Sequence, residues 1–260
     1  MKTLSRSVGR PDIGGEPMAT VFRTFDTNQI VFRRSEVSII AGTPGAGKST
    51  LALALALRMQ APTLYVSADT NAHTMAMRLY SMIEGVSQSE AERIISNEPD
   101  LAKEKLALAK HIYWSFDSSP SLNDLDDEVT ALEETLGDSP ALIVIDNLMD
   151  ISMDGGEEFS NMRSALKELK YLARDTNSAV VVLHHTQESY SGDPCQPRSS
   201  LQGKVAQLPA LILTVGQQNG LLGVAAVKNR YGKADASGHS PVWLQFNPEY
   251  MFISDLEEAR

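Results

Sequence analysis

Nine consecutive residues in the first fifth of the chain have the types and the spacing that bind phosphate. They are Gly42, Thr43, Pro44, Gly45, Ala46, Gly47, Lys48, Ser49 and Thr50. The first eight match the pattern G-x-x-x-x-G-K-[ST], whose glycines let backbone N–H groups point inward at an anion. A chance glycine-rich turn is the alternative, but an apolar run precedes the motif and a Leu- and Ala-rich segment follows it, as between a strand and a helix. We therefore predict a nucleotide site in which Lys48 reaches the β- and γ-phosphates and Ser49 ligates Mg²⁺.

A carboxylate that could complete the metal site follows an apolar run later in the chain. Four apolar residues, Leu142 to Ile145, lead directly to Asp146, as in a Walker B strand. A strand that simply ends at an aspartate would give the same pattern. Beside a phosphate loop, however, the carboxyl end of a buried strand is where a carboxylate can hold Mg²⁺ through water. We predict that Asp146 holds the metal in this way.

Hydrolysis of a bound nucleotide would also need a carboxylate that polarises the attacking water. Asp69 follows the apolar run that begins at Thr63, and a strand next to the phosphate-loop strand would place it beside the γ-phosphate. Aspartate is also a favoured N-cap residue, so Asp69 could instead cap a helix that begins near Asn71. We predict the catalytic role.

These residues need a scaffold, and strand-length apolar runs alternate with helix-period segments along most of the chain. The predicted strands are 36–41, 63–68, 112–116, 141–146, 179–184, 210–215 and 221–227, and the predicted helices are 49–59, 71–84, 89–96, 101–110, 122–136 and 159–176. Strands that are apolar throughout predict an α/β fold, a mainly parallel sheet with helices on both faces. After His185 strands follow one another with few helices between them, which predicts an antiparallel C-terminal edge.

Length and composition limit the class of protein. A chain of 260 residues accommodates one substantial domain, which we place at 31–260, preceded by an N-terminal arm or linker at 1–30. The lone cysteine, Cys195, excludes an internal disulfide and fits a reducing cytosol. The longest apolar stretch, 51–57, is too short to span a membrane, and we find no secretion signal, so we expect a cytoplasmic protein. The net charge of −10 argues against general affinity for polyanions but leaves room for a local basic groove.

Together the motifs resemble the RecA-like motor domain of DnaB-type replicative helicases, within the wider group of RecA, KaiC and plasmid RepA-like P-loop ATPases. The resemblance extends from about Val31 to Phe252. In that family a glutamate that activates water ends the strand after the phosphate loop, and here Asp69 stands at its position in Ser67-Ala68-Asp69-Thr70. The following Ala76-Met77-Arg78-Leu79 also resembles the family's helix. A glutamine that senses the γ-phosphate ends a later strand in DnaB-like proteins. Here His185 stands at that position, and its neutral imidazole can donate one hydrogen bond to phosphate.

Two histidines are adjacent at the end of that strand, and metal binding or simple polarity at a strand end is the alternative to a sensor. Adjacent residues on a strand point to opposite faces, so His184 and His185 are poor joint ligands for one metal. We predict the sensor role for His185 and a packing role for His184.

The segment Lys228-Asn229-Arg230 matches the Lys-x-Arg pair that DnaB-like helicases insert into the neighbouring subunit's ATP site. Residues two apart on a strand share a face, so Lys228 and Arg230 can point together at one triphosphate. An arginine supplied in this way neutralises charge in the transition state. A solvated basic strand end is the alternative.

Two loops of the family face a central channel and hold single-stranded DNA. By position they are 152–161 and 187–203 here, and Arg198 and Lys204, and also Gln202, could contact phosphates. The first loop carries acidic residues, and either loop could be an ordinary solvated connection.

The resemblance implies an ATP-dependent DNA motor or strand-handling ATPase, with ATP and Mg²⁺ as cofactors, single-stranded DNA as a partner and a hexameric ring of copies. An alternative is a RecA/KaiC-like recombination mediator or regulatory ATPase that does not translocate. A DNA-processing nuclease on the same scaffold is a third possibility, although no compact Asp/Glu/Lys nuclease signature stands out.

Overall fold

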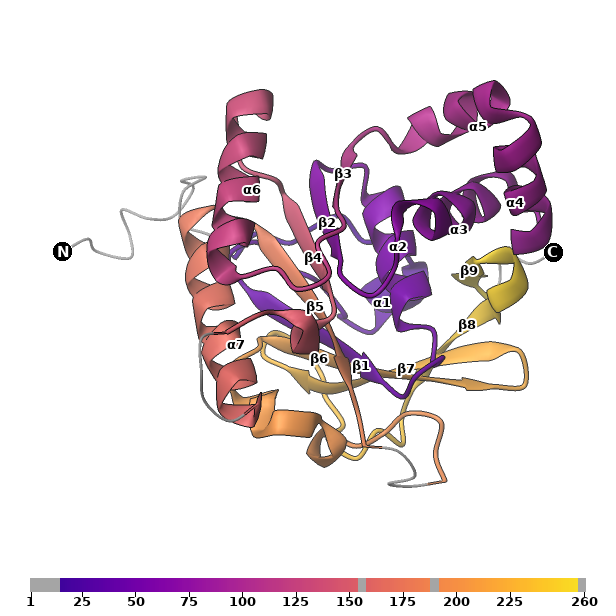
Figure 1. Ribbon diagram of the computed structural model, residues 1–260. Coiled ribbons are helices and arrows are strands. Elements are labelled where there is room, and N and C mark those ends of the chain that lie inside the picture. Colours follow the sequence, from indigo (N-terminus) through magenta and orange to yellow (C-terminus); the bar gives the residue numbers. More distant parts are fainter. Residues whose placement is uncertain (1–14, 154–157, 188–191, 257–260) are drawn as a thin grey trace.

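A nine-stranded sheet runs through the molecule, and its strands follow the order β3-β2-β4-β5-β1-β6-β7-β8-β9 (Figure 1). The computed structural model describes residues 15–153, 158–187 and 192–256. The strands are β1 (Val37–Gly42), β2 (Thr63–Ser67), β3 (Ile112–Ser115), β4 (Leu142–Asp146), β5 (Ala179–His185), β6 (Leu211–Gln218), β7 (Leu221–Asn229), β8 (Val242–Asn247) and β9 (Phe252–Asp255). All seven predicted strands are present, with ends shifted by up to three residues.

The sheet is parallel from β3 to β6 and antiparallel from β7 to β9. Every residue of β1, β2 and β4 is buried, which is why these strands have apolar residues on both faces. The predicted mainly parallel sheet with an antiparallel C-terminal edge is confirmed.

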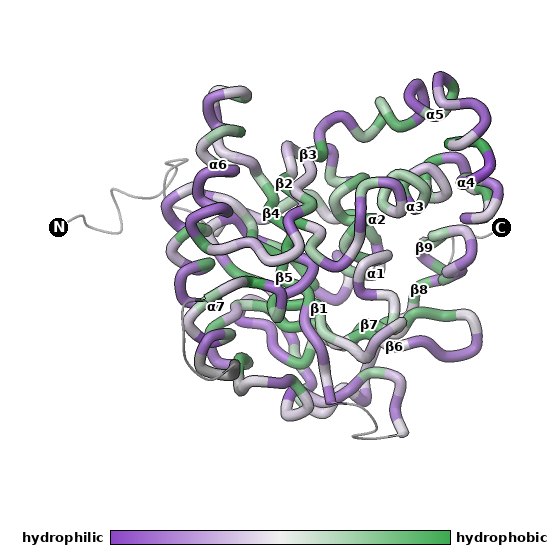
Figure 2. The backbone as a smooth tube through the Cα atoms, viewed as in Figure 1, coloured by the Kyte–Doolittle hydropathy of each residue, from purple (hydrophilic) through white to green (hydrophobic). Residues whose placement is uncertain are grey.

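Helices cover both faces of the sheet. They are α2 (Lys48–Met59), α3 (Ala72–Glu84), α4 (Gln88–Asn97), α5 (Pro99–Leu106), α6 (Leu122–Leu136) and α7 (Glu158–Asp175). One apolar core joins the sheet to α2 and α3, and a second joins its other face to α6 and α7, as the two sides of Figure 1 show. The hydropathy colouring in Figure 2 places the most apolar segments in the strands between these helices.

The segment that precedes β1 packs against the C-terminal strand. We expected 1–30 to form an arm or linker, but Phe22 and Phe25 are each 1% exposed, within the core. The short helix α1 (Arg23–Thr27) lacks a cap from its own N-cap side chain. Instead, the Asp255 carboxylate accepts hydrogen bonds of 2.9 Å from the N–H groups of Arg23 and Thr24. Residues 1–14 lie outside the described residues.

Three further features differ from the sequence predictions or refine them. The predicted helix 101–110 divides into α5 and a 3₁₀ turn, Ala107–Ala109. The long segment after β5 contains two 3₁₀ helices, η5 (Arg198–Ser200) and η6 (Gln202–Gln207). No helix within the described ranges is long and apolar enough to cross a membrane.

Candidate nucleotide site

The phosphate loop connects β1 to α2, and its glycines are required by the backbone. Gly47, the N-cap of α2, has φ +100°, which L side chains rarely adopt. At Gly42 a Cβ atom would lie 2.8 Å from the carbonyl oxygen of Val215. The loop is also braced from β6, because Gln217 Nε2 donates to the carbonyl of Gly45 at 2.6 Å. The sequence motif therefore forms the loop that it predicts.

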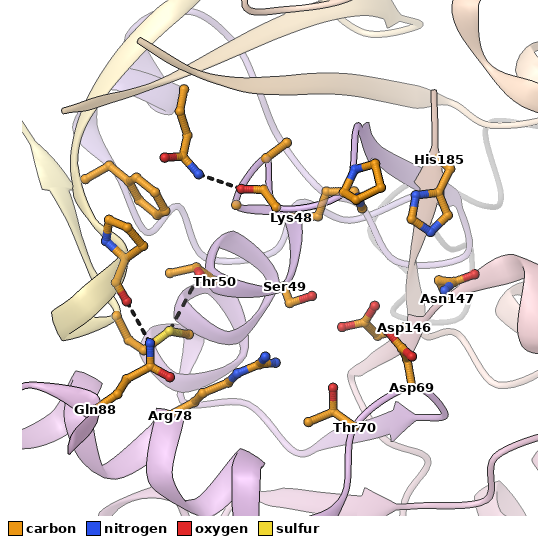
Figure 3. Close-up of a pocket in the computed structure, with 18 residues that line it drawn as sticks. Lys48, Ser49, Thr50, Asp69, Thr70, Arg78, Gln88, Asp146, Asn147 and His185 are labelled. Atoms are coloured by element: carbon orange, nitrogen blue, oxygen red, sulfur yellow. Dashed lines mark hydrogen bonds between the residues drawn. The ribbon is translucent and has the colours of Figure 1, made fainter. Parts of the chain in front are cut away.

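A cavity of about 330 Å³ lies over this loop (Figure 3). Its walls include Lys48 and Ser49 from the start of α2, Asp69 beyond β2, Asp146 at the end of β4 and His185 at the end of β5. These side chains come together because the carboxyl ends of parallel strands meet at one edge of the sheet. Together with Pro44 to Gly47 and Thr50, which also line the cavity, they bring ten of the predicted site residues around one space.

Lys48 holds the loop in its present form. Its Nζ donates to the carbonyl oxygens of Gly42 and Thr43, both at 3.0 Å. Burial lowers the pKa of Lys48, and the nearby carboxylates of Asp146 and Asp69 oppose that shift. The ammonium group is therefore poorly solvated, and an anion bound in the cavity would stabilise its charge.

Asp146 is 8% exposed, and burial raises the pKa of its carboxyl group. A hydrogen bond with Ser49 and the charge of Lys48 oppose that rise. A hydroxyl and a carboxylate held together fit Mg²⁺, which takes its remaining ligands from water and substrate phosphates. Ser49 and Asp146 are therefore the candidate metal ligands. Among the described residues no group of three or more His, Cys, Asp or Glu side chains could hold a metal.

Asp69 is not the cap of the helix that follows it. The N-cap of α3 is Asn71, whose side chain accepts a hydrogen bond of 2.9 Å from the backbone N–H of Thr74. The capping alternative for Asp69 is therefore wrong. Its side chain lies on the cavity wall together with Thr70 (Figure 3).

The two adjacent histidines point to opposite faces of β5, as predicted. His185 lines the cavity, and burial together with the Lys48 charge lowers its pKa, so its imidazole is neutral at neutral pH. His184 is fully buried on the other face, where its Nε2 lies 2.9 Å from the carbonyl oxygen of Gln202 in η6.

Arg230 lies far from this cavity. It is near the amino ends of the parallel strands, whereas the cavity lies at their carboxyl ends. The backbone N–H of Arg230 donates to Ala210, whose own N–H donates to Val37 at the start of β1. Its guanidinium group pairs with Glu36 at 2.8 Å, and the Tyr231 hydroxyl donates to the same carboxylate oxygen at 2.8 Å.

Lys228 also bonds to groups of its own chain that lie outside the cavity. Its Nζ donates to the carbonyl oxygens of Ala206 and Gln207, at 2.9 and 2.8 Å. Burial lowers the pKa of Lys228, and the charges of Arg230 and Arg198 add to that shift. The two predicted finger residues are thus close to each other but not to the phosphate loop of the same chain.

The predicted DNA contacts are only partly described. Arg198 is exposed at the start of η5, and its backbone N–H donates to Ala236 at 2.9 Å. Lys204 lies in η6, but its side chain is outside the described residues, as are 154–157 and 188–191 in the two predicted DNA loops.

Comparison with known proteins decides the family. A model of the AAA domain matches residues 30–189, which is more than half of the chain. The chain belongs to the AAA domain family. Its sequence is 34% identical to the gene 65 protein of Mycobacterium phage L5, over 93% of this chain and 94% of that protein.

Two more distant relatives of this AAA domain handle DNA according to their names. It is 26% identical to the mouse DNA repair protein RAD51 homolog 4, over 72% of this chain and 57% of that protein. It is 23% identical to a probable plasmid replicative DNA helicase of Chlamydia trachomatis, over 92% of this chain and 55% of that protein.

Solved structures show that the AAA domain has the RecA-like fold of DnaB-type ATPase domains. One of them, solved as an isolated ATPase domain, matches with a TM-score of 0.80 and 17% identity, covering 97% of this chain and 96% of that one. A DnaB-like replicative helicase, solved in a study of its interactions with primase, matches with the same score and identity and covers 97% of this chain and 66% of that one.

Several cavity residues of the AAA domain were not predicted as site residues. Arg78 reaches the cavity from α3 (Figure 3), and its charge opposes the rise in the pKa of Asp146. The resemblance of its helix to the DnaB family was the available signal in the sequence. Further wall residues are Asn147 after β4, Gln88 in α4, Gln217 in β6, Phe246 in β8, and Pro248 and Met251 between β8 and β9.

Proposed function

We propose that this AAA domain is a DNA motor that hydrolyses ATP at sites shared between neighbouring copies in a hexameric ring. The observation that carries the proposal is the distance between Arg230 and the phosphate loop of the same chain. Arg230 is paired with Glu36, just before β1, and the phosphate loop follows the other end of β1. Six residues at about 3.3 Å each separate them by about 20 Å, which an arginine side chain cannot cross. Arg230 can therefore serve a triphosphate only in another copy, and head-to-tail contacts of this kind close into rings.

One copy would supply the phosphate loop and the groups around the reacting water. Lys48 leaves the carbonyls of its own loop for the β- and γ-phosphates. Ser49 and Asp146 would hold Mg²⁺, which neutralises charge on the phosphate oxygens when bound. Asp69 accepts a hydrogen bond from the attacking water and polarises it, and neutral His185 donates a hydrogen bond to the γ-phosphate.

The neighbouring copy would supply the cations. Arg230 exchanges Glu36 for the γ-phosphate and stabilises the charge of the transition state. Lys228 releases the carbonyls of Ala206 and Gln207 and joins it. Hydrolysis then depends on assembly.

Single-stranded DNA is the proposed partner, with contacts from Arg198 and Lys204. The fold shared with a DnaB-like replicative helicase and the relative named as a probable plasmid replicative DNA helicase support this assignment. A cytoplasmic location stays a prediction from the sequence.

The test is ATP hydrolysis with and without single-stranded DNA, paired with the mass of the protein in ATP and Mg²⁺. We expect a ring whose hydrolysis DNA accelerates. Arg230→Ala should lose hydrolysis and keep ATP binding, because Arg230 lies outside the cavity that binds ATP. The matched control is Arg93→Ala, an exposed arginine paired with acidic side chains around α4, and it should hydrolyse normally. Hydrolysis that is indifferent to DNA would contradict the motor, and an active Arg230→Ala would contradict the shared site.

A strand-handling ATPase that does not translocate is a second candidate, favoured by the similarity to the DNA repair protein RAD51 homolog 4. A strand-displacement assay separates the two. The motor unwinds a forked duplex in ATP, whereas the second candidate binds the single strand and leaves the duplex intact.

A further inference from the structure

Helix α7 carries four basic residues along one side. Arg163, Lys167, Lys170 and Arg174 are spaced i, i+4, i+7 and i+11, which places them in one row along a helix. Three are exposed and Lys170 is half-buried. The row, here called the α7 basic stripe, is about 16 Å long at 1.5 Å per residue. It stands out in a chain whose net charge is −10.

Within the part of the chain that the structure describes, the α7 basic stripe has no acidic partner. None of its four side chains has a carboxylate within 4.0 Å among those residues. The acidic residues of the same helix segment, Glu168 and Asp175, fall outside this row by their spacing. Four cations without such counter-ions form a local positive field that attracts a polyanion.

The stripe is continuous with the segment proposed to hold DNA. Arg163 Nη2 donates to Gln207 Oε1 in η6 at 3.3 Å, and α7 packs along η6. Lys170 also lies close enough to Lys228 for its charge to contribute, after burial, to the lowered pKa of that lysine. The stripe therefore lies beside η6, with Lys170 near the end of β7. Figure 1 shows α7 at the outer side of the sheet, away from α3 to α5.

An aromatic side chain lies beside the row. Tyr171 is 59% exposed, and its spacing from Lys167 (i+4) and Arg174 (i−3) places it on the same side of the helix. Aromatic faces flanked by cations bind unpaired bases by stacking, and duplex bases are not available for it. The tyrosine therefore favours a single strand over a duplex, and over an acidic protein.

We propose that the α7 basic stripe and Tyr171 form a second contact surface for single-stranded nucleic acid, in which the cations bind successive phosphates and the tyrosine stacks on a base. This surface rests on the proposed function, and it extends the path of the strand from η6 along the outside of α7.

The experiment measures binding of a labelled oligo-dT of about 20 nucleotides to the full-length protein over a series of salt concentrations. The double variant Lys167→Gln/Lys170→Gln should bind more weakly, and its salt slope should fall by about 1.4, or 0.7 for each phosphate contact removed. Tyr171→Ala should lose about five-fold or more in affinity, whereas Tyr171→Phe keeps the stacking face and the affinity. The control Lys103→Gln/Lys110→Gln removes two exposed cations, one in α5 and one just after it, and should bind like the wild type.

Each outcome has one meaning. Wild-type protein that does not bind the oligonucleotide overturns the proposed function itself. Wild-type binding that the stripe variants match in affinity and salt slope overturns only this inference. Stripe variants that lose mass in solution would make the stripe a subunit interface, and Tyr171→Ala binding like the wild type would remove the stacking role. Hydrolysis without DNA should be unchanged in every variant.

Discussion

At the scale of single residues, burial in the cavity disfavours the charges of Lys48 and Asp146, and a bound nucleotide would change the charge around them. Burial lowers the pKa of Lys48 and raises that of Asp146, and the attraction between the two opposes both shifts. Such a site is arranged in advance for a ligand that is both anionic and bound to a cation. Magnesium and a triphosphate together meet that description.

Asp69 gives the first prediction at this scale. Asp69→Asn keeps the size and polarity of the side chain but removes the base, so turnover should fall by about 10²- to 10⁴-fold with little change in ATP affinity. Steady-state hydrolysis and equilibrium binding of labelled ATP measure the two quantities. Asp126→Asn, on the exposed side of α6, is the matched control. Normal turnover in Asp69→Asn would assign the carboxylate elsewhere.

Site residues could be predicted from the sequence where a short run of consecutive residues marks them. The phosphate loop and Asp146 follow from a few consecutive residues, because each is a strand end with a characteristic neighbour. Arg78, Gln217 and Phe246 reach the cavity from separate elements. Their place depends on how α3, β6 and β8 pack. Only the helix of Arg78 carries a signal, its resemblance to the DnaB family, and no short pattern records the packing of Gln217 and Phe246.

At the scale of secondary-structure elements, β5 connects the nucleotide cavity with the other face of the sheet. Its last residue, His185, borders the cavity, and His184 on the opposite face contacts η6. Burial lowers the pKa of His184 to about 4, from 6.5 for an exposed histidine. Burial therefore keeps His184 neutral, although its hydrogen bond to the Gln202 carbonyl opposes that shift.

The pH dependence of stability tests that contact. An unfolded chain protonates His184 below about pH 6.5 and the folded protein does so only near pH 4, so the free energy of unfolding decreases as the pH falls between these values. By about pH 5 the loss from this group is about 2 kcal/mol. Urea unfolding at several pH values should show a shallower decrease in His184→Gln, which keeps an N–H near the Gln202 carbonyl. Equal decreases in both proteins would mean that His184 is protonated in the fold.

The elements that the sequence did not predict include α1, β8 and β9. The helix α1 has five residues, and its first N–H groups are capped by Asp255, more than 200 positions away. The strands β8 and β9 complete the antiparallel edge after a segment with no periodicity. The longer elements were predicted because their apolar pattern alone is sufficient, as for α6, whose bounds are those predicted.

At the scale of the whole molecule, the parallel sheet separates the two halves of the proposed site. Lys48 and its neighbours occupy the carboxyl edge, and Lys228 and Arg230 the amino edge. Under the proposed function the chain holds half a site at each edge, and the two halves would meet only between copies.

Mixing two inactive variants tests that claim most directly. Lys48→Ala keeps an intact Arg230, and Arg230→Ala keeps an intact phosphate loop, so neither alone should hydrolyse ATP. In an equal mixture about one interface in four joins two intact halves, and hydrolysis should recover to about a quarter of the wild-type rate. A mixture that stays as inactive as its components, while still forming rings, would contradict the shared site.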